Sequence, residues 1–274
     1  MSDNIEIDGV PFDALSYEQV LEGIDFLIRR GGHAFITTPN PEMVLNAKAD
    51  PQFKNVLKKA DISIPDGIGI LWAAHYLSKP KASNLVVERM KWLGSLFGVL
   101  FWPSSIKTVI KERITGSDLF EEVVAQSEVT GWRIFLLGAE PGVAESATEA
   151  LMAEYPKANI VGYYAGTPAE HDTSINIEKI NEAKPDILFV AYGSPAQERW
   201  IYANLEEMDT VRVAIGVGGA FDFAAGKVLR APRWMQMFGL EWFWRLGQEP
   251  KRFKRIYKAT VRFSNFIYRL KIEK

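Results

Sequence analysis

Short apolar runs alternate along this chain with longer segments in which apolar residues recur at helical spacing. The runs predict buried strands at residues 33–37, 61–65, 133–138, 159–164, 186–193 and 211–219. The segments between them predict helices, and another helix is predicted before the first strand, where it follows a capping pattern, Ser16 to Gln19, and ends at Gly31-Gly32. Strands that alternate with helices are typical of right-handed βαβ units. The pattern therefore predicts an α/β fold with a mostly parallel sheet and helices on both faces.

Residues 90–102 (MKWLGSLFGVLFW) interrupt this alternation with an apolar and aromatic stretch. The stretch is too short to cross a bilayer, which takes about 20 residues of helix. One interpretation is a helix of the protein core. The other is a helical hairpin that enters the lipid interface, flanked by Lys91 and Lys107. Both interpretations fit the pattern.

Charge is distributed unevenly along the chain. The formal net charge is −2, but residues 227–274 contain 13 Lys and Arg against three Glu. From Trp234 onward, aromatic residues recur with Arg and Lys at helical spacing, which is typical of a basic amphipathic helix on a membrane or on another protein. Nucleic acid is the alternative partner, but no motif for binding it is recognisable. We therefore predict contact with an anionic membrane surface and none with nucleic acid.

Composition narrows the chemistry. The chain has no cysteine and only three dispersed histidines, so it has no disulfide and an improbable transition-metal site. No two aspartates stand two residues apart, so the short acidic motif with which many sugar-nucleotide enzymes hold a divalent ion is missing. The N-terminus lacks the pattern of a signal peptide, and no run of 18 apolar residues occurs. We expect no metal, no cofactor and a cytoplasmic location.

The loops that follow the predicted strands are the first places to search for a site, since ligands of open parallel sheets bind beyond the carboxyl ends of the strands. Glycine in such loops lets backbone N–H groups approach a phosphate closely. None of the loops matches the dinucleotide fingerprint, and no Walker lysine motif is present. The loops are Thr37-Thr38-Pro39-Asn40, Pro65-Asp66-Gly67-Ile68-Gly69, Gly138-Ala139-Glu140-Pro141-Gly142, Tyr192-Gly193-Ser194-Pro195 and Gly216-Val217-Gly218-Gly219-Ala220-Phe221-Asp222.

Asp66 is the candidate catalytic acid, because it follows a buried strand and precedes a glycine-rich turn. The alternative is that it only caps the next helix. Thr38 and Asn40 are candidates that fit equally well as turn formers. Gln197 fits a solvated position in the first turn of a helix, and Asp222 either caps a turn or accepts a hydrogen bond from a nucleotide base. For the arginines of the C-terminal segment, the alternative is simple solvation at the surface.

These loops, in this order, resemble the WecG/TagA/CpsF glycosyltransferase family, which is family 26 of the carbohydrate-enzyme classification. The resemblance covers roughly residues 5–270, apart from the stretch near 84–112. Seven motifs in register are a far more specific signal than one glycine loop. They are TPNPEMV (38–44), IPDGIGI (64–70), TGSDLF (115–120), IFLLGAEPGV (134–143), YGSPAQERW (192–200), GVGGAFDFAAG (216–226) and RAPRWMQMFGLEWFWRLGQEPKRFKR (230–255).

The resemblance implies an inverting, metal-independent transferase with a Rossmann-like core and a basic helical C-terminal appendage. The donor it implies is a UDP-sugar, and the acceptor is a saccharide linked to polyprenyl diphosphate. N-acetylmannosamine or its uronic acid is the sugar of the best-known members, and glucose or another hexose is the alternative. The implied domains are a catalytic core at 1–226, with an apolar insertion at about 84–112, and a membrane-binding appendage at 227–274. A peripheral location on the inner face of the cell membrane follows, and a homo-oligomer is left open.

The resemblance also implies roles for particular residues. Asp66 matches the proposed general base, Thr38 and Asn40 match pocket residues near the transferred sugar, and Gln197 matches a polar residue implicated in catalysis. Three arginines match basic residues that close over the site at the acceptor diphosphate and the membrane. These are Arg245, Arg252 and Arg255. The residues that match the nucleotide-sugar site are Gly138, Ala139, Tyr192, Gly193, Ser194, Gly218, Gly219 and Asp222.

Two other classes of protein remain as rivals. A nucleotide-dependent oxidoreductase would use a similar sheet, but the missing fingerprint and the basic aromatic tail count against it. A non-catalytic membrane adaptor would explain the tail but not the polar residues gathered after so many strands.

Overall fold

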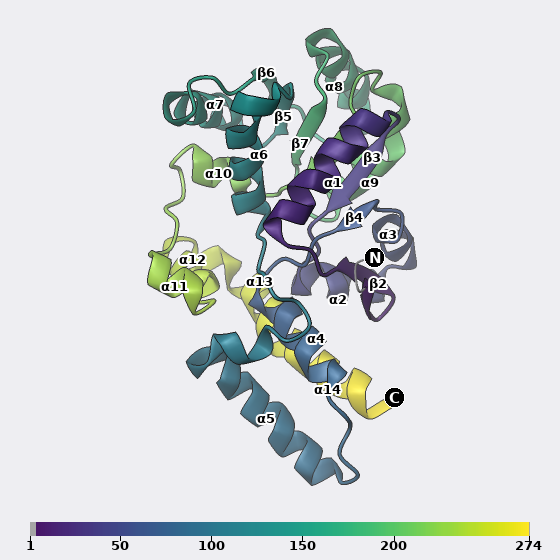
Figure 1. Ribbon diagram of the computed structural model, residues 1–274, viewed down its shortest axis with the longest axis vertical. Coiled ribbons are helices and arrows are strands. Elements are labelled where there is room, and N and C mark those ends of the chain that lie inside the picture. The colour runs from purple at the N-terminus through teal and green to yellow at the C-terminus, as the bar shows by residue number, and fades with distance from the viewer. Residues whose placement is uncertain (1–3, 274) are drawn as a thin grey trace.

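A six-stranded parallel sheet forms the centre of the computed structural model, which describes residues 4–273 (Figure 1). The strand order is β4-β3-β8-β7-β5-β6, and every neighbouring pair is parallel. The six predicted strands are therefore confirmed, although each is shorter than its apolar run. Their bounds are β3 (Ala34–Thr37), β4 (Ile62–Ser63), β5 (Ile134–Gly138), β6 (Ile160–Tyr164), β7 (Ile187–Ala191) and β8 (Val213–Gly216). Residues 1–3 and 274 of the predicted domains lie outside the described residues.

Helices cover both faces of the sheet, as predicted. On one face, α1 (Tyr17–Arg30), α6 (Gly116–Thr130), α7 (Val143–Glu154) and α10 (Ala220–Ala224) pack on alternate residues of the strands. The intervening residues of the strands face α8 (Glu170–Ala183) and α9 (Ala196–Asn204) on the other. This alternation places successive side chains of one strand in different cores, because neighbouring residues of a strand point to opposite faces. Ser16 begins α1 with the predicted capping box.

A second lobe lies beyond one end of the sheet, where Figure 1 shows α4 (Ile68–Ser78), α5 (Leu85–Phe101) and α14 (Phe263–Glu273). Its core also contains the antiparallel hairpin of β1 (Asn4–Ile7) and β2 (Val10–Asp13), and side chains of α2 (Pro41–Ala49) and α3 (Pro51–Leu57). The basic C-terminal segment thus contributes buried side chains to a core built mainly from the first 110 residues. The domain boundary at residue 226 stays a prediction.

The C-terminal segment is a series of short helices rather than one long amphipathic helix. They are α11 (Arg233–Met237), α12 (Glu241–Gln248), α13 (Phe253–Tyr257), the π-helical turn η4 (Lys258–Arg262) and α14. The helical path is interrupted at Gly239, where φ is positive, and at Pro250, which has no backbone N–H to donate. The chain can therefore wrap around the second lobe instead of leaving it.

Both interpretations of residues 90–102 need correction. Residues 90–101 belong to one continuous helix, α5, and Trp102 is its C-cap, so no hairpin is present within this stretch. Nor is α5 a core helix, because most of the apolar side chains described on it are exposed and, of these, Trp92 alone is buried. In residues 4–273 no helix combines the length and the apolar character needed to cross a bilayer.

Candidate active site

One cavity of about 650 Å³ lies between the sheet and the second lobe. Its walls come from the loop after β4, the start of α2, the segment before α6, and helices α4, α5 and α12–α14. Five of the residues predicted from sequence line it together, although they come from distant parts of the chain. These are Asn40, Asp66, Arg245, Arg252 and Arg255.

The carboxyl group of Asp66 is the most perturbed acid in this cavity. Burial raises its pKa to about 7, and the negative charges of Glu241 and Asp118 add to the increase. The guanidinium of Arg113 and a hydrogen bond from the backbone N–H of Gly116 act in the opposite direction. A carboxylate with a pKa near neutrality accepts a proton more readily than an ordinary aspartate, while it is still half ionised at pH 7.

The helix-cap interpretation of Asp66 is wrong. Gly67 occupies the N-cap position of α4, and its helix has no side-chain cap. Asn40 does cap a helix, because its side-chain oxygen accepts a hydrogen bond from the backbone N–H of Met43 at 3.1 Å. Since Asn40 also lines the cavity, the turn-forming and site interpretations of this residue are both compatible with the structure.

Carboxylates hold the arginines of the cavity in place. Glu249 accepts from Arg245 at 3.0 Å and from Arg252 at 2.7 Å, so these two side chains are not simply solvated. The Arg245 guanidinium also lies over the Phe223 ring, 4.6 Å from its centroid. Burial and the charge of Arg252 lower the pKa of Arg245. Among the described residues, the buried Nη2 atom of Arg245 has no hydrogen-bond partner, so this donor is available to an anion.

Arg255 and Arg113 complete the basic lining. Arg255 donates to the Glu42 carboxylate through Nε and Nη2, both at 2.9 Å, which ties α13 to the start of α2. Arg113 has no ion pair with any residue in the range 4–273, and it enters the cavity just before α6. Four guanidinium groups therefore surround a space that is large enough for a ligand, and guanidinium forks match the oxygen atoms of phosphates.

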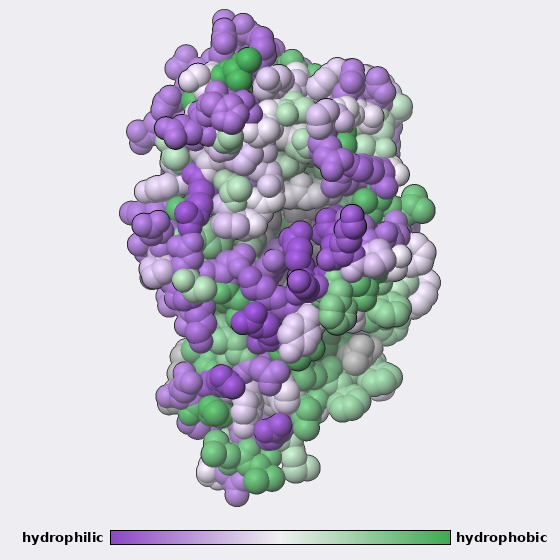
Figure 2. All heavy atoms as spheres, turned by 180° about the vertical axis from the view of Figure 1, so that it is seen from behind, coloured by the Kyte–Doolittle hydropathy of each residue, from purple (hydrophilic) through white to green (hydrophobic). Residues whose placement is uncertain are grey.

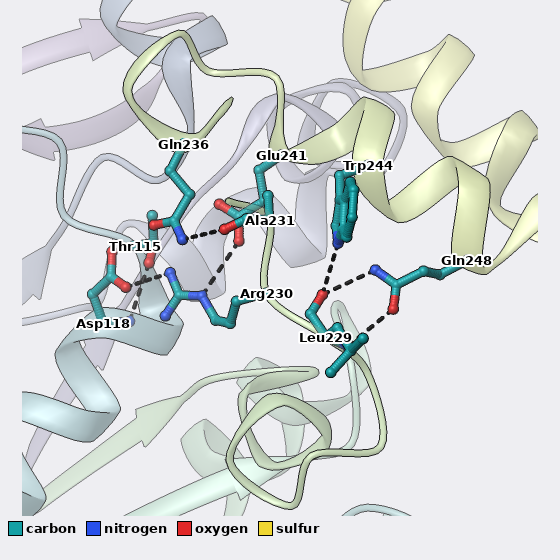
Figure 3. A network of polar contacts seen from close by, with 9 residues as sticks. All are labelled: Thr115, Asp118, Leu229, Arg230, Ala231, Gln236, Glu241, Trp244 and Gln248. Atoms are coloured by element: carbon teal, nitrogen blue, oxygen red, sulfur yellow. Dashed lines mark hydrogen bonds and ion pairs between the residues drawn. The ribbon is translucent and has the colours of Figure 1, made fainter. Parts of the chain in front are cut away.

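A network of polar contacts attaches α12 to the core beside this cavity (Figure 3). Arg230 pairs with Asp118 at the start of α6, and its Nε lies 3.6 Å from the Glu241 carboxylate at the start of α12. The carbonyl oxygen of Leu229 accepts hydrogen bonds from Trp244 and Gln248 on α12, at 3.1 and 2.9 Å. These contacts fix the helix that carries Arg245.

Thr38 and Gln197 do not line the cavity but support the loops behind it. The buried Thr38 hydroxyl donates to the Gly216 carbonyl at 3.4 Å and lies against Gly116, whose N–H binds Asp66. The Gln197 side-chain oxygen accepts from the backbone N–H groups of Gly193 and Gly218, each at 3.0 Å. Because Gln197 is buried, its interpretation as a solvated first-turn residue is wrong.

The predicted nucleotide residues cluster at the carboxyl ends of β5, β7 and β8, outside the lining of the cavity. Ala139 follows β5 with φ of 63°, and the Tyr192 ring packs on Gly138, where an added Cβ would lie 2.8 Å from it. Ser194 has a buried hydroxyl, and the Asp222 carboxylate lies 3.9 Å from Lys227. Their role in nucleotide binding stays a prediction.

Gly219 connects this cluster to the cavity. A Cβ added at Gly219 would lie 2.8 Å from Nη2 of Arg245, the donor that lacks a partner. Only a residue without a side chain leaves room for the guanidinium at this place. The glycine loop after β8 and the basic tail therefore meet at Arg245.

We expect Gly219→Ala to displace the Arg245 guanidinium and to lower binding of an anionic ligand about tenfold, while the fold stays intact because φ at Gly219 is −84°. Gly247→Ala is the matched control, since Gly247 also lies in this region and an added Cβ there meets nothing within 4 Å. Isothermal titration with UDP or with inorganic pyrophosphate measures the effect. Equal affinity of the two variants would contradict the role assigned to this contact.

Sequence reasoning missed three residues of the site. Arg113 and Thr115 lie just before α6, and Glu241 is the first residue of α12. All three line the cavity. Two signals were available: the motif TGSDLF contained Thr115, the N-cap of α6, and the motif at 230–255 contained Glu241. Nothing in the spacing along the chain relates Arg113 or Glu241 to Asp66.

Comparison with known proteins gives relatives that match nearly the whole chain. A protein of Bacillus subtilis (strain 168) is 34% identical over 233 residues, which is 83% of this chain and 78% of the relative. Relatives from Bacillus spizizenii and Staphylococcus aureus (strain MW2) are 31% and 28% identical, over 92% and 97% of this chain and 84% and 91% of their own lengths. Each of the three is named an N-acetylglucosaminyldiphosphoundecaprenol N-acetyl-beta-D-mannosaminyltransferase.

The model of the glycosyl transferase WecG/TagA/CpsF family matches in two segments, residues 5–98 and 97–274. The segments meet within α5, the helix that belongs to the predicted insertion. Together they span nearly all of the chain, and with the relatives they show that it belongs to the WecG/TagA/CpsF family of glycosyl transferases.

Proposed function

We propose that this chain transfers a sugar of the N-acetylmannosamine type from a UDP-sugar to a saccharide linked to polyprenyl diphosphate, with inversion at the anomeric carbon. The observation that carries the proposal is the position of Asp66, an acid with a pKa of about 7, in one cavity with four arginines. A base for a hydroxyl group and donors for phosphate oxygens are the two requirements of such a transfer. The names of the relatives support the choice of sugar and acceptor.

Asp66 acts as the general base. The acceptor hydroxyl oxygen forms a bond to the anomeric carbon while the bond from that carbon to the β-phosphate oxygen of UDP breaks. The bonding electrons leave with UDP, and the hydroxyl proton passes to the Asp66 carboxylate. General-base assistance of this kind accelerates a reaction by about 10²–10⁴-fold. The pKa of Asp66 suits the task because the carboxylate is both available and basic near neutral pH.

Arginine and backbone donors stabilise the charge that develops on UDP, and in this proposal no metal ion takes part. The unpartnered Nη2 of Arg245 and the guanidinium of Arg113 are placed for such contacts. Backbone N–H groups of the loops around Gly138, Gly193 and Gly218 hold the nucleotide, with Gln197 keeping two of these loops in register. Fixed donors in a site with little water are worth more than the same donors in solution.

The second lobe rests on an anionic membrane surface on the cytoplasmic side. Aromatic and apolar side chains of α11–α13, including Trp234, Phe243 and Phe253, are exposed among Lys and Arg. Figure 2 shows hydrophobic residues gathered over the lower half of the face in view, the half that contains this lobe. Each basic residue near an anionic bilayer contributes about 1 kcal/mol, so binding by the tail weakens with salt.

Product analysis by mass spectrometry tests the proposal directly. The full chain is offered a panel of UDP-sugars with N-acetylglucosamine linked to a short-chain lipid diphosphate. We expect one added N-acetylhexosamine from UDP-N-acetylmannosamine, with the same rate in EDTA as in Mg²⁺. If only glucose or another hexose is transferred, the donor is a UDP-hexose and not UDP-N-acetylmannosamine. Transfer that stops in EDTA and returns with Mg²⁺ would contradict the absence of a metal, and no transfer from any donor would overturn the function.

A further inference from the structure

The cavity that contains Asp66 has a second, apolar half that the transfer reaction itself does not need. Arg113, Arg245, Arg252 and Arg255 belong to its charged half. The apolar half is lined by side chains from α4, α5 and the C-terminal helices. These are Trp72, Trp92, Leu96, Val99, Ile256, Ala259, Val261 and Phe263. A sugar nucleotide or a glycan would leave this surface without polar contacts, so its chemistry calls for an apolar ligand.

Helix α5, which forms one wall of the apolar half, has apolar side chains both on the side that faces the cavity and on the opposite side. Trp92, Leu96 and Val99 recur at intervals of four and three residues, so they lie on one side of the helix and face the cavity. On the opposite side, an exposed stripe follows the same helical spacing. It contains Val86, Met90, Leu93, Phe97 and Phe101. Exposed apolar patches of this kind mark surfaces that bind other molecules or a membrane.

Hydrogen bonds hold α5 in place against α4 and α14 of the second lobe. The Trp92 indole donates to the Ser264 carbonyl at 3.1 Å, which connects α5 with α14. One turn before Trp92, the buried Glu88 accepts from the Tyr76 hydroxyl at 2.6 Å and from the Ala82 N–H at 2.7 Å. Next to Leu96, the Ser95 hydroxyl accepts from the Trp72 indole of α4 at 2.9 Å. These contacts fix α5 as a wall, and the space beside Leu96 and Val99 is part of the folded structure.

We propose that the apolar half of the cavity binds the isoprenoid chain of the acceptor next to its diphosphate, with α5 as the wall that separates this chain from solvent. The inference rests on the proposed function, which supplies a polyprenyl diphosphate as substrate. The two halves then match the two parts of that substrate, because Arg252 and Arg255 face its diphosphate and the apolar wall faces the hydrocarbon, while Arg113 and Arg245 serve UDP. The exposed stripe of α5 lies where the remaining chain continues into the bilayer.

Selectivity for the length of the acceptor chain tests this site. Transfer by the full chain is measured with undecaprenyl-diphosphate-linked N-acetylglucosamine in detergent micelles and with the same sugar diphosphate on a short alkyl group. Val99→Trp fills the apolar half, and we expect the ratio of kcat/KM for the long acceptor to kcat/KM for the short one to fall by about tenfold or more. Val129→Trp is the matched control, because Val129 is 87% exposed on α6.

A second variant keeps the test valid where tryptophan prevents folding. Val99→Thr preserves the shape of the side chain but places a hydroxyl in the apolar wall, so the same ratio should fall in the same direction by a smaller factor. An unchanged ratio in both Val99 variants, or an equal loss with both acceptors, would overturn the site. If the wild-type chain transfers sugar to neither acceptor, the proposed function fails, and this result is distinct from a change in the ratio.

Discussion

Asp66→Asn is expected to lower the transfer rate by about 10²–10⁴-fold, which is the usual contribution of a general base. The amide has nearly the same shape and still accepts the hydrogen bond from the Gly116 N–H, but it cannot take a proton. The loss should therefore appear in kcat, with the affinity for UDP largely kept. Steady-state kinetics and UDP titration measure the two quantities separately.

The pH dependence of the wild type provides an independent check of the same residue. Since burial raises the pKa of Asp66 to about 7, the ionised base is lost as the pH falls below 7. We expect kcat/KM to rise with pH and to level off above about pH 8, as it does when one group must be deprotonated. In Asp66→Asn the residual rate should no longer follow this curve.

Stability should change in the opposite sense to activity. A carboxyl whose pKa is raised on folding from 3.8 to about 7 binds its proton more tightly in the folded state. Its contribution to stability is full below pH 3.8 and is lost as the pH rises to 7. Asp66→Asn has no such loss, so at pH 8 we expect its free energy of unfolding to be on the order of 4 kcal/mol higher than that of the wild type.

Asp209→Asn is the control for these measurements, because Asp209 is exposed at the surface and lies outside the cavity. It should alter neither kcat nor the difference in stability between pH 5 and pH 8. Near-normal turnover in Asp66→Asn would reject Asp66 as the base, whatever happens to stability.

The sheet was predictable because buried parallel strands need apolar residues on both faces, and so each of the six left a continuous apolar run. Asp66 could be placed for the same reason, since it directly follows one of these runs. The arginines that line the cavity gave no such signal in the spacing of the sequence. Arg245 reaches Gly219 only because the tail turns back at Gly239 and Pro250, and periodicity within short helices does not give their direction.

The family resemblance supplied residues that spacing alone did not, and the structure sorts them by position. Asn40 and the three arginines of the tail line the cavity with Asp66, whereas Thr38 and Gln197 support loops behind it. Composition was a poor guide to residues 90–102, because apolar content does not distinguish a buried helix from a wall with one exposed face. That distinction depends on neighbours such as Ser264, which lie far along the chain.

Phe266→Ala is expected to lower the free energy of unfolding by about 3–5 kcal/mol, as truncation of a buried phenylalanine usually does. Phe266 lies on α14, only 7% exposed, among buried side chains of the second lobe. Its ring also faces the Lys48 ammonium, 4.1 Å from the ring centroid. Urea unfolding followed by circular dichroism measures the change, and Phe253→Ala provides the matched control because Phe253 is 62% exposed on α13.

The comparison separates two descriptions of the C-terminal segment. If residues 227–274 were an appendage that only covers a finished core, both variants would unfold at the same urea concentration as the wild type, with changes within about 0.5 kcal/mol. The buried positions of Phe266 and Ile267 instead make α14 part of the core beside α4. Removing the segment would then expose that core as well as delete the arginines, so loss of transfer in a truncated chain would not by itself assign a role to them. Point variants such as Gly219→Ala avoid this ambiguity, because they move Arg245 and leave α14 in place.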